Sequence, residues 1–356
     1  MTSCAYPHPL DYVAGIKHCV TDLVVKHEFR VSPETFVVEE LVDWEVLGLN
    51  PEKGEYAVIR VEKSGVDTLK AVSLLASVLE MPEENVLYYG LKDKNATTVS
   101  YFFVKTVLLR EINFTLEKPG VRYIHIGYVK KKPHREAFKG NRFTVLLGEL
   151  SNGDVEVLNR IISVAKEIGL LSYYGYQRFG TRRFNSHVLG KALLTNKLDV
   201  FADALLGPSP LEEASEWARR VCGDYSGLYY EERFVEKGLD GLPRRVVEIY
   251  LEAYSSYLFN LLLNKIFEEE GVSALNSYLP MPGCRENKVY EDIFEKEGLS
   301  SKAASKLPCY TRSGLFKPRD VELRRVGKGF ELAFTLDPGF YATIVLREVF
   351  KENLVL

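Results

Sequence analysis

Residues 86–106 read VLYYGLKDKNATTVSYFFVKT, two strand-like segments on either side of the loop GLKDKNATT at 90–98. The flanking segments are rich in valine, tyrosine and phenylalanine, which favour β-strands, whereas the glycine and asparagine of the loop favour a turn. Asp93 is the only acid in this loop, and it lies between two lysines. A lone carboxylate held between two strands is a candidate for chemistry.

The whole chain has 356 residues, 46% of them hydrophobic, and a formal net charge of -3 at pH 7. This length suits two domains, each with a sizeable core. The apolar runs are too short to span a bilayer and the N-terminus lacks a signal-like segment, so we expect a cytoplasmic protein without a membrane partner. With this net charge, any binding of nucleic acid must come from local clusters of lysine and arginine.

The five cysteines lie far apart, at positions 4, 19, 222, 284 and 309, and none belongs to a C-x-x-C pair. This spacing predicts neither a zinc site nor a disulfide framework, and it fits a reducing compartment. The six histidines show no ligand spacing, and the sequence contains no serine-elbow, Walker or G-x-G-x-x-G motif. Hydrolysis by a metal or a catalytic triad is therefore unsupported, and no metal is expected.

The pattern of hydrophobic residues predicts an α+β fold. Segments 35–42 and 55–62 are rich in β-branched residues with turn residues between them, which predicts a long-looped hairpin. A helix is expected after a capping Thr68, and another helix between Asp154 and Gly169. Further strands are expected at 87–89, 98–106, 122–129 and 142–147. This order favours a mixed, mainly antiparallel sheet.

After about residue 185 the pattern becomes helical, at 187–206, 211–222 and 244–270. Strand patterns return at 319–325 and 330–336, and residues 340–350 fit either a helix or a strand. This order predicts a largely helical domain inserted into a sheet domain that holds both termini.

Two segments combine basic and aromatic residues, VKKKPHREAFKGNRF at 129–143 and YYGYQRFGTRRFN at 173–185. Cations neutralise phosphates, and aromatic rings stack on unpaired bases. Taken alone, the first segment also fits a solvated loop and the second an aromatic core hairpin, but their occurrence in one chain favours binding to nucleic acid. The candidate RNA-binding residues are Lys131, Lys132, Arg142, Arg178, Arg182 and Arg183.

Five segments resemble motifs of the TruD family of pseudouridine synthases, in the family's order. GLKDKNATT resembles the motif G-x-K-D-[KR]-x-A-x-T, whose aspartate is the family's catalytic residue. The other matching segments are PETFVVEEL at 33–41, KKKPHREAFKGNRF at 130–143, YYGYQRFG at 173–180 and LDPGFYATIVLRE at 336–348. The resemblance implies a catalytic pseudouridine synthase domain, formed by 1–184 plus 312–356, and an inserted α+β TRUD domain at 185–311.

The resemblance further implies isomerisation of uridine to pseudouridine in tRNA, at uridine 13, with Asp93 as the catalytic residue. No atoms enter or leave in this reaction, so neither a cofactor nor a metal is expected. Whether the carboxylate attacks the anomeric carbon of the sugar or removes a proton from the sugar stays open. A buried carboxylate needs a cation to stay charged, and the candidates for that cation are Lys92, Lys94 and Arg347.

Other residues expected to bind the substrate are Phe143, which would stack on the flipped uracil, and Asn141, which would hydrogen-bond its edge, together with Glu40 and Gln177. The expected partner is tRNA or another structured RNA, and the chain is expected to act as a monomer. Two alternatives remain. One is an RNA-binding protein or RNA chaperone of the same fold without turnover. The other is an acid-dependent glycosidase, although that chemistry normally needs a second carboxylate.

Overall fold

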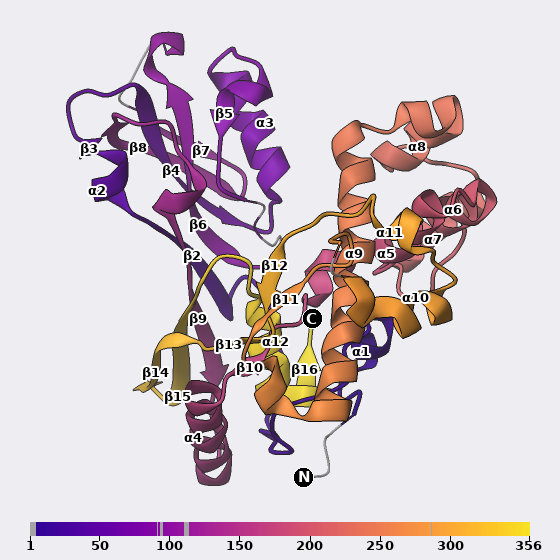
Figure 1. The fold of residues 1–356 in the computed structure, drawn as a ribbon. Helices are drawn as coiled ribbons and strands as arrows, with labels where there is room; N and C mark the ends of the chain where they lie inside the picture. Colours follow the sequence, from indigo (N-terminus) through magenta and orange to yellow (C-terminus); the bar gives the residue numbers. More distant parts are fainter. Residues whose placement is uncertain (1–4, 91, 93–94, 110–113, 286) are drawn as a thin grey trace. The chain divides into compact units, whose positions relative to one another are not determined.

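The computed structural model describes residues 5–90, 92, 95–109, 114–285 and 287–356, and the chain forms two compact units (Figure 1). Unit 1 consists of Met1–Leu23, Ile168–Phe316 and Thr343–Glu352, and unit 2 of Val24–Glu167, Lys317–Ala342 and Asn353–Leu356. Within the described parts of the chain, no helix is both long and apolar enough to cross a membrane. Asp93 and Lys94 lie outside the described residues.

Unit 2 contains a large mixed sheet with the strand order β14-β15-β9-β2-β6-β4-β8-β3, to which β5 and β7 add as partners of β6 and β8. Strands β2 and β6 are parallel, and the other pairs of this sheet are antiparallel. The predicted α+β class with a mainly antiparallel sheet is confirmed. The strands are β2 (Phe36–Val42), β3 (Leu49–Asn50), β4 (Tyr56–Ser64), β5 (Val86–Leu87), β6 (Thr97–Lys105), β7 (Thr115–Lys118), β8 (Val121–Val129), β9 (Phe138–Gly148), β14 (Arg319–Val326) and β15 (Gly329–Leu336).

A small parallel pair in unit 2 joins β1 (Phe29–Arg30) to β16 (Leu354–Val355). The α-helices of this unit are α2 (Trp44–Leu47), α3 (Thr68–Val78) and α4 (Asn152–Glu167), with 3-10 turns η1 (Glu83–Asn85), η2 (Thr106–Leu108) and η3 (Arg135–Ala137).

Helix α3 covers one face of the sheet, beside β4 and β6 (Figure 1). Its apolar side chains recur three or four residues apart, and they pack on Ile59 and Val61 of β4 and Phe102 of β6. The helix starts one residue before the expected first helical position, because Asp67 is the N-cap and its side chain accepts a hydrogen bond from the amide of Lys70. Thr68, the expected cap, is therefore the first residue of the helix.

Unit 1 is mainly helical, and its longest helix is α9 (Arg244–Glu270), as the periodicity predicts. Helix α5 (Ser186–Leu194) packs so closely on α9 that a Cβ atom at Gly190 would lie 1.9 Å from the carbonyl oxygen of Tyr250. A glycine is required there because any side chain would push the helices apart. The other α-helices are α1 (Pro9–Ala14), α6 (Leu198–Leu206), α7 (Ala214–Val221), α8 (Tyr229–Lys237), α10 (Glu291–Glu297), α11 (Ser301–Ala304) and α12 (Ala342–Phe350).

Two short antiparallel pairs accompany these helices, β10 (Leu170–Leu171) with β13 (Leu315–Phe316) and β11 (Tyr278–Pro280) with β12 (Thr311–Ser313). The 3-10 turns after residue 170 are η4 (Tyr176–Phe179), η5 (Gly238–Gly241), η6 (Val272–Leu275), η7 (Asn287–Tyr290) and η8 (Lys351–Asn353).

Three local expectations differ from the structure or are decided by it. The predicted hairpin of 35–42 with 55–62 is wrong, because β6 lies between β2 and β4 and pairs with both of them. The predicted helix 187–206 is divided into α5 and α6, because Asn196 adopts a left-handed conformation with φ 56°. Residues 340–350, which fit either element, form the helix α12.

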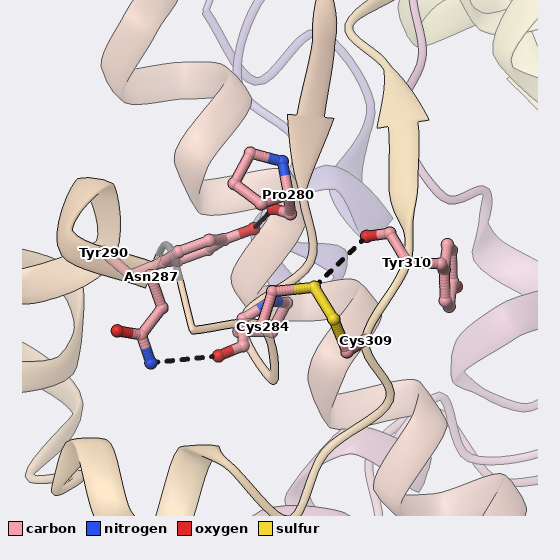
Figure 2. Close-up of a disulfide and its surroundings, with 7 residues drawn as sticks. Pro280, Cys284, Asn287, Tyr290, Cys309 and Tyr310 are labelled. Carbon is pink, nitrogen blue, oxygen red and sulfur yellow. Dashed lines mark hydrogen bonds between the residues drawn. A yellow bond between two sulfur atoms is a disulfide. The ribbon is translucent and has the colours of Figure 1, made fainter.

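The expectation of no disulfide is also wrong, because Cys284 is bonded to Cys309 in unit 1 (Figure 2). The two cysteines are 25 residues apart in sequence, but the amide of Met281 donates to the carbonyl of Tyr310 just beyond the β11–β12 pair. This contact brings the two Cα atoms to 4.6 Å. Sequence spacing could not reveal this proximity because it arises from strand pairing.

The two compact units do not have the bounds of the two predicted domains. Unit 1 contains all of 185–311 and also takes in segments from both ends of the chain. The two compact units are defined by which residues pack together, whereas the predicted insertion is defined by where one domain interrupts the sequence of the other. The insertion at 185–311 therefore stays a prediction.

Candidate active site

A group of polar side chains lies on the sheet face that α3 covers. Ile59 and Val61 of β4 face α3, and strand alternation places Lys63 on the same face. The register of β4 with β6 aligns Lys63 with Thr98 and Val61 with Ser100. The face therefore changes from apolar to polar toward the end of β4.

Strands β2 and β9 extend this polar region. Their register places Glu40 opposite Asn141, and Val38 opposite Phe143. Residues directly opposite on neighbouring strands present their side chains on the same face within about 5.5 Å at Cβ. Val38 is also paired with Thr98 of β6, so strand pairing brings together residues of the motifs at 33–41, 90–98 and 130–143.

Glu40 forms a buried ion pair with Lys92, the residue directly before Asp93 in the sequence. Oε1 of Glu40 lies 2.8 Å from Nζ of Lys92, and the side chains are 1% and 8% exposed. The other carboxylate oxygen of Glu40 accepts a hydrogen bond from the amide of Tyr101 at 2.9 Å. Nζ of Lys92 also lies 5.1 Å from the ring centroid of Phe138. Burial, and then the negative charge of Glu40, raise the pKa of Tyr89.

The backbone amide and carbonyl of Lys92 also form hydrogen bonds. Its amide donates to the hydroxyl of Thr68 at 2.8 Å, and its carbonyl oxygen lies 3.4 Å from the same hydroxyl, which donates to it. Nζ of Lys63 donates to this carbonyl at 3.4 Å. Contacts from β2, β4 and α3 therefore converge on the residue that precedes the predicted catalytic aspartate.

We call Glu40, Lys63, Lys92, Thr98, Ser100 and Asn141 the polar cluster. Three of its oxygen atoms are buried without a hydrogen-bond partner among the described residues: Oγ1 of Thr98, Oγ of Ser100 and Oδ1 of Asn141. Burying polar groups without partners costs stability, so such groups in a core point to a functional site. Their chemistry suits a ligand that offers both donors and acceptors.

Phe143 is packed as a member of an aromatic row on the sheet. It is 6% exposed, and its ring is stacked with Phe36, at 5.8 Å between centroids, and with Phe334, at 5.3 Å. These contacts are those of a core residue in the structure at hand. Stacking of uracil on Phe143 stays a prediction.

The basic segment 129–143 lies in unit 2 with the polar cluster. Lys131 and Lys132 are exposed, whereas Arg142 in β9 is half-buried with its guanidinium 3.4 Å from the carboxylate of Glu322. Gly140 in this segment has φ 115°, and a Cβ atom there would lie 2.0 Å from the carbonyl oxygen of Leu336. The glycine of the G-N-R-F motif is thus explained by the close approach of β15.

The three arginines expected to bind RNA in unit 1 are paired with glutamates. Arg178 pairs with Glu252 at 3.0 Å, and Arg182 pairs with Glu216 at 3.0 Å and with Glu231. Arg183 is 7% exposed and donates to the carbonyls of Ala204 and Leu205, at 2.6 and 2.8 Å, and to that of Gly207. Through these contacts, Arg183 stabilises the fold of unit 1.

Arg347 and Gln177 also lie in unit 1. Nε of Arg347 donates to Oδ1 of Asp11 at 2.7 Å, and both side chains are at most 1% exposed. The hydroxyl of Tyr176 donates to the same carboxylate oxygen at 2.5 Å. Gln177 accepts a hydrogen bond from the hydroxyl of Thr343 at 3.1 Å. Substrate binding by Arg347 and Gln177 stays a prediction.

Sequence reasoning missed two residues of this region. Lys63 occupies an inward position of β4, after Ala57, Ile59 and Val61, and a lysine that interrupts such an apolar row is a recognisable signal. Thr68 gave no such signal, because a threonine at a helix start is explained by capping alone.

Comparisons with known proteins agree with the motifs. The model of the family described as tRNA pseudouridine synthase D (TruD) matches residues 15–225. A protein of Pyrobaculum aerophilum named as tRNA pseudouridine synthase D is 30% identical over 382 residues, which cover 90% of this chain and 91% of the relative. One of Geotalea daltonii with the same name is 24% identical and covers 91% of this chain and 96% of the relative.

The fold agrees as well. The crystal structure of a TruD protein from Methanosarcina mazei superposes with a TM-score of 0.65, covers 96% of this chain and 97% of the other, and is 19% identical in sequence. Because the family model spans more than half of the chain and the similarity to a 30% identical relative extends over 90% of it, this chain belongs to the TruD family of tRNA pseudouridine synthases.

Proposed function

We propose that this chain isomerises uridine to pseudouridine in tRNA, at position 13, with Asp93 as its catalytic residue. The observation that carries this proposal is membership of the TruD family together with an intact GLKDKNATT segment at 90–98. The polar cluster supports it, because ionic and hydrogen-bonding contacts converge on Lys92, next to Asp93 in the chain.

The reaction breaks the bond between C1′ of the ribose and N1 of uracil and forms a bond between C1′ and C5. One proton leaves C5 and N1 gains one, so the atoms balance without a co-reactant. The Asp93 carboxylate either attacks the anomeric carbon or takes a proton from the sugar. A preorganised site with few water molecules strengthens electrostatic stabilisation in both cases.

The polar cluster would receive the flipped uracil. Uracil offers an N–H donor and two carbonyl acceptors, and the unpartnered Oδ1 of Asn141 and hydroxyls of Thr98 and Ser100 complement these groups. Phe143 would supply a ring next to Asn141 on the same strand face. Glu40 would act by keeping Lys92 in place.

Lys131 and Lys132 would contact tRNA phosphates, because both are exposed and no ion pair joins either to a carboxylate among the described residues. Arg142, Arg178 and Arg182 would bind RNA if it displaces their glutamate partners. The chain would work as a monomer in the cytoplasm, where tRNA is modified. The bond between Cys284 and Cys309 removes the support that the cysteine spacing gave to a reducing compartment, because disulfides are rare in reducing compartments.

The test is to incubate the purified protein with tRNA transcripts that carry uridine or cytidine at position 13 and to map pseudouridine by mass spectrometry. Product is expected only with uridine at that position. Asp93→Asn should bind tRNA and form no product, because the amide keeps the size of the side chain and removes its charge. Asp320→Asn is the matched control, since Asp320 is exposed on β14 and asparagine tolerates its φ of 49°.

The outcomes separate the alternatives. A pure protein that binds tRNA without forming pseudouridine would be an RNA-binding protein of this fold, and release of free uracil would indicate a glycosidase. Turnover by Asp93→Asn within about tenfold of the parent, about 1.4 kcal/mol in activation free energy, would contradict the catalytic role of Asp93.

A further inference from the structure

We propose that the hydroxyl of Thr68 is a positioning group for the reaction, because it fixes the backbone of Lys92 from the first turn of α3. The inference rests on the proposed function of Asp93, the next residue in the chain. The position of Thr68 in the sequence indicates only the start of a helix, so this role comes from the tertiary structure.

The hydroxyl oxygen of Thr68 engages both backbone groups of Lys92. It accepts from the amide at 2.8 Å and donates to the carbonyl oxygen at 3.4 Å. One side chain thereby restrains both the amide and the carbonyl of Lys92, the residue directly before Asp93 in the sequence. Thr68 is 24 residues away in sequence, so this is a tertiary contact.

Thr68 is itself held rigidly. It is 2% exposed, and it follows the N-cap Asp67, whose side chain accepts from the amide of Lys70 at 2.8 Å. The next turns of α3 are anchored by Ala71, Val72 and Leu75 in the core under the sheet face. The direction of the Thr68 hydroxyl is set by the two hydrogen bonds with the backbone of Lys92.

Other contacts complete the restraint on Lys92. Nζ of Lys63 donates to its carbonyl, and the ion pair with Glu40 holds its ammonium group. Removing the hydroxyl of Thr68 would therefore leave the side chain of Lys92 in place and release mainly its backbone. We expect the catalytic carboxylate to lose its alignment while the fold of unit 2 is retained.

Such a change should act on the chemical step. Misplacing a reacting group by about 1 Å costs up to about a hundredfold in rate, whereas substrate affinity depends on contacts elsewhere. Thr68→Val keeps the branched shape and removes the hydroxyl. Its kcat for pseudouridine formation in tRNA should fall at least about tenfold, with KM within about threefold of the parent. Thr68→Ser keeps the hydroxyl and should retain kcat within about threefold.

Thr106→Val is the matched control. The hydroxyl of Thr106 donates to the carbonyl of Gly54 at 2.8 Å, so this variant loses one hydrogen bond in unit 2 outside the polar cluster. A general weakening of unit 2 would lower the turnover of Thr106→Val and Thr68→Val together. Equal kcat values for Thr68→Val and Thr106→Val would overturn the positioning role.

Hydrogen exchange gives a second measurement that does not depend on activity. In the parent, the amide of Lys92 should exchange slowly, and in Thr68→Ser it should remain protected. Rapid exchange of this amide in the folded parent would overturn the proposal even if Thr68→Val does not fold. The failure of the proposed function is distinct, because an Asp93→Asn variant with parental turnover contradicts the role of Asp93 whatever the exchange data show.

Discussion

Nζ of Lys92 lies 2.8 Å from Oε1 of Glu40, and this ion pair is almost completely shielded from water. It connects strand β2 with the segment that leads into Asp93. Taking two charges out of water is costly, and each partner offsets the cost of the other. The pair is therefore a sensitive point for both the stability of unit 2 and the alignment of the site.

Removing one partner of this pair should destabilise the protein more than removing both. Glu40→Gln leaves the ammonium of Lys92 buried without its counter-charge, so the free energy of unfolding should fall by about 3–5 kcal/mol. The double variant Glu40→Gln/Lys92→Met should cost less than the two single changes together. Urea unfolding of the parent and the three variants gives the coupling energy, and additive losses would contradict the ion pair.

The two lysines of the basic segment should contribute to the salt dependence of tRNA binding. Each lost phosphate contact lowers the slope of log K against log salt by about 0.7–0.9, so Lys131→Ala/Lys132→Ala should lower it by about 1.5. The control is Arg325→Ala/Lys328→Ala, which removes two exposed cations of the β14–β15 hairpin. Equal slopes for both double variants would indicate that Lys131 and Lys132 are solvated surface charges that do not contact phosphates.

Arg183 serves as the contrast in the same titrations. Because its guanidinium donates to backbone carbonyls inside unit 1, Arg183→Ala should lower the melting temperature and leave the salt slope of the folded protein unchanged. A lowered slope at parental stability would instead favour a phosphate contact.

The stability of the protein should fall in mild acid because of His187. Burial, and then the charge of Lys191, lower the pKa of His187 from 6.5 to about 4. Between these two values the unfolded state binds more protons than the folded state, so the stability is fully present above pH 6.5 and is lost as the pH falls toward 4. The loss reaches about 1.4 kcal/mol per pH unit within this window.

His187→Phe isolates that contribution. The ring of His187 packs on Phe179 and Tyr257, so an aromatic replacement preserves these contacts and removes the titration. Urea unfolding between pH 4 and 7 should show a shallower pH dependence for His187→Phe than for the parent. Parallel curves would show that His187 is protonated equally in both states.

The disulfide should stabilise unit 1 by restricting the unfolded chain. In the chain-entropy treatment, a bond between cysteines 25 residues apart contributes about 3.5 kcal/mol. Cys284→Ser/Cys309→Ser should lower the unfolding midpoint, and a reducing agent should lower the parent midpoint to a similar value while leaving the double variant unchanged. A midpoint of the parent that does not respond to reduction, together with free thiols on titration, would contradict the bond.

The sequence by itself determined the features that depend on local pattern. The period of the apolar residues located α9, β14 and β15 almost to the residue, because amphipathic spacing is a property of each segment alone. The motifs at 90–98 and 130–143 identified the family, because reaction chemistry restricts which residues can stand there. The same motifs singled out Lys92 and Asn141, and the motif at 33–41 singled out Glu40.

Only the tertiary structure decided which of these segments meet. The strand-like segments 35–42 and 55–62 predicted a hairpin, but in the sheet they are separated by β6, which follows both in sequence. The local pattern of a segment does not encode a strand partner that lies far along the chain. The same applies to the hydroxyl of Thr68 on Lys92, to the bond between Cys284 and Cys309, and to the buried guanidinium of Arg183. Each contact joins residues 21 or more apart in sequence, and it forms only after packing has brought both partners together.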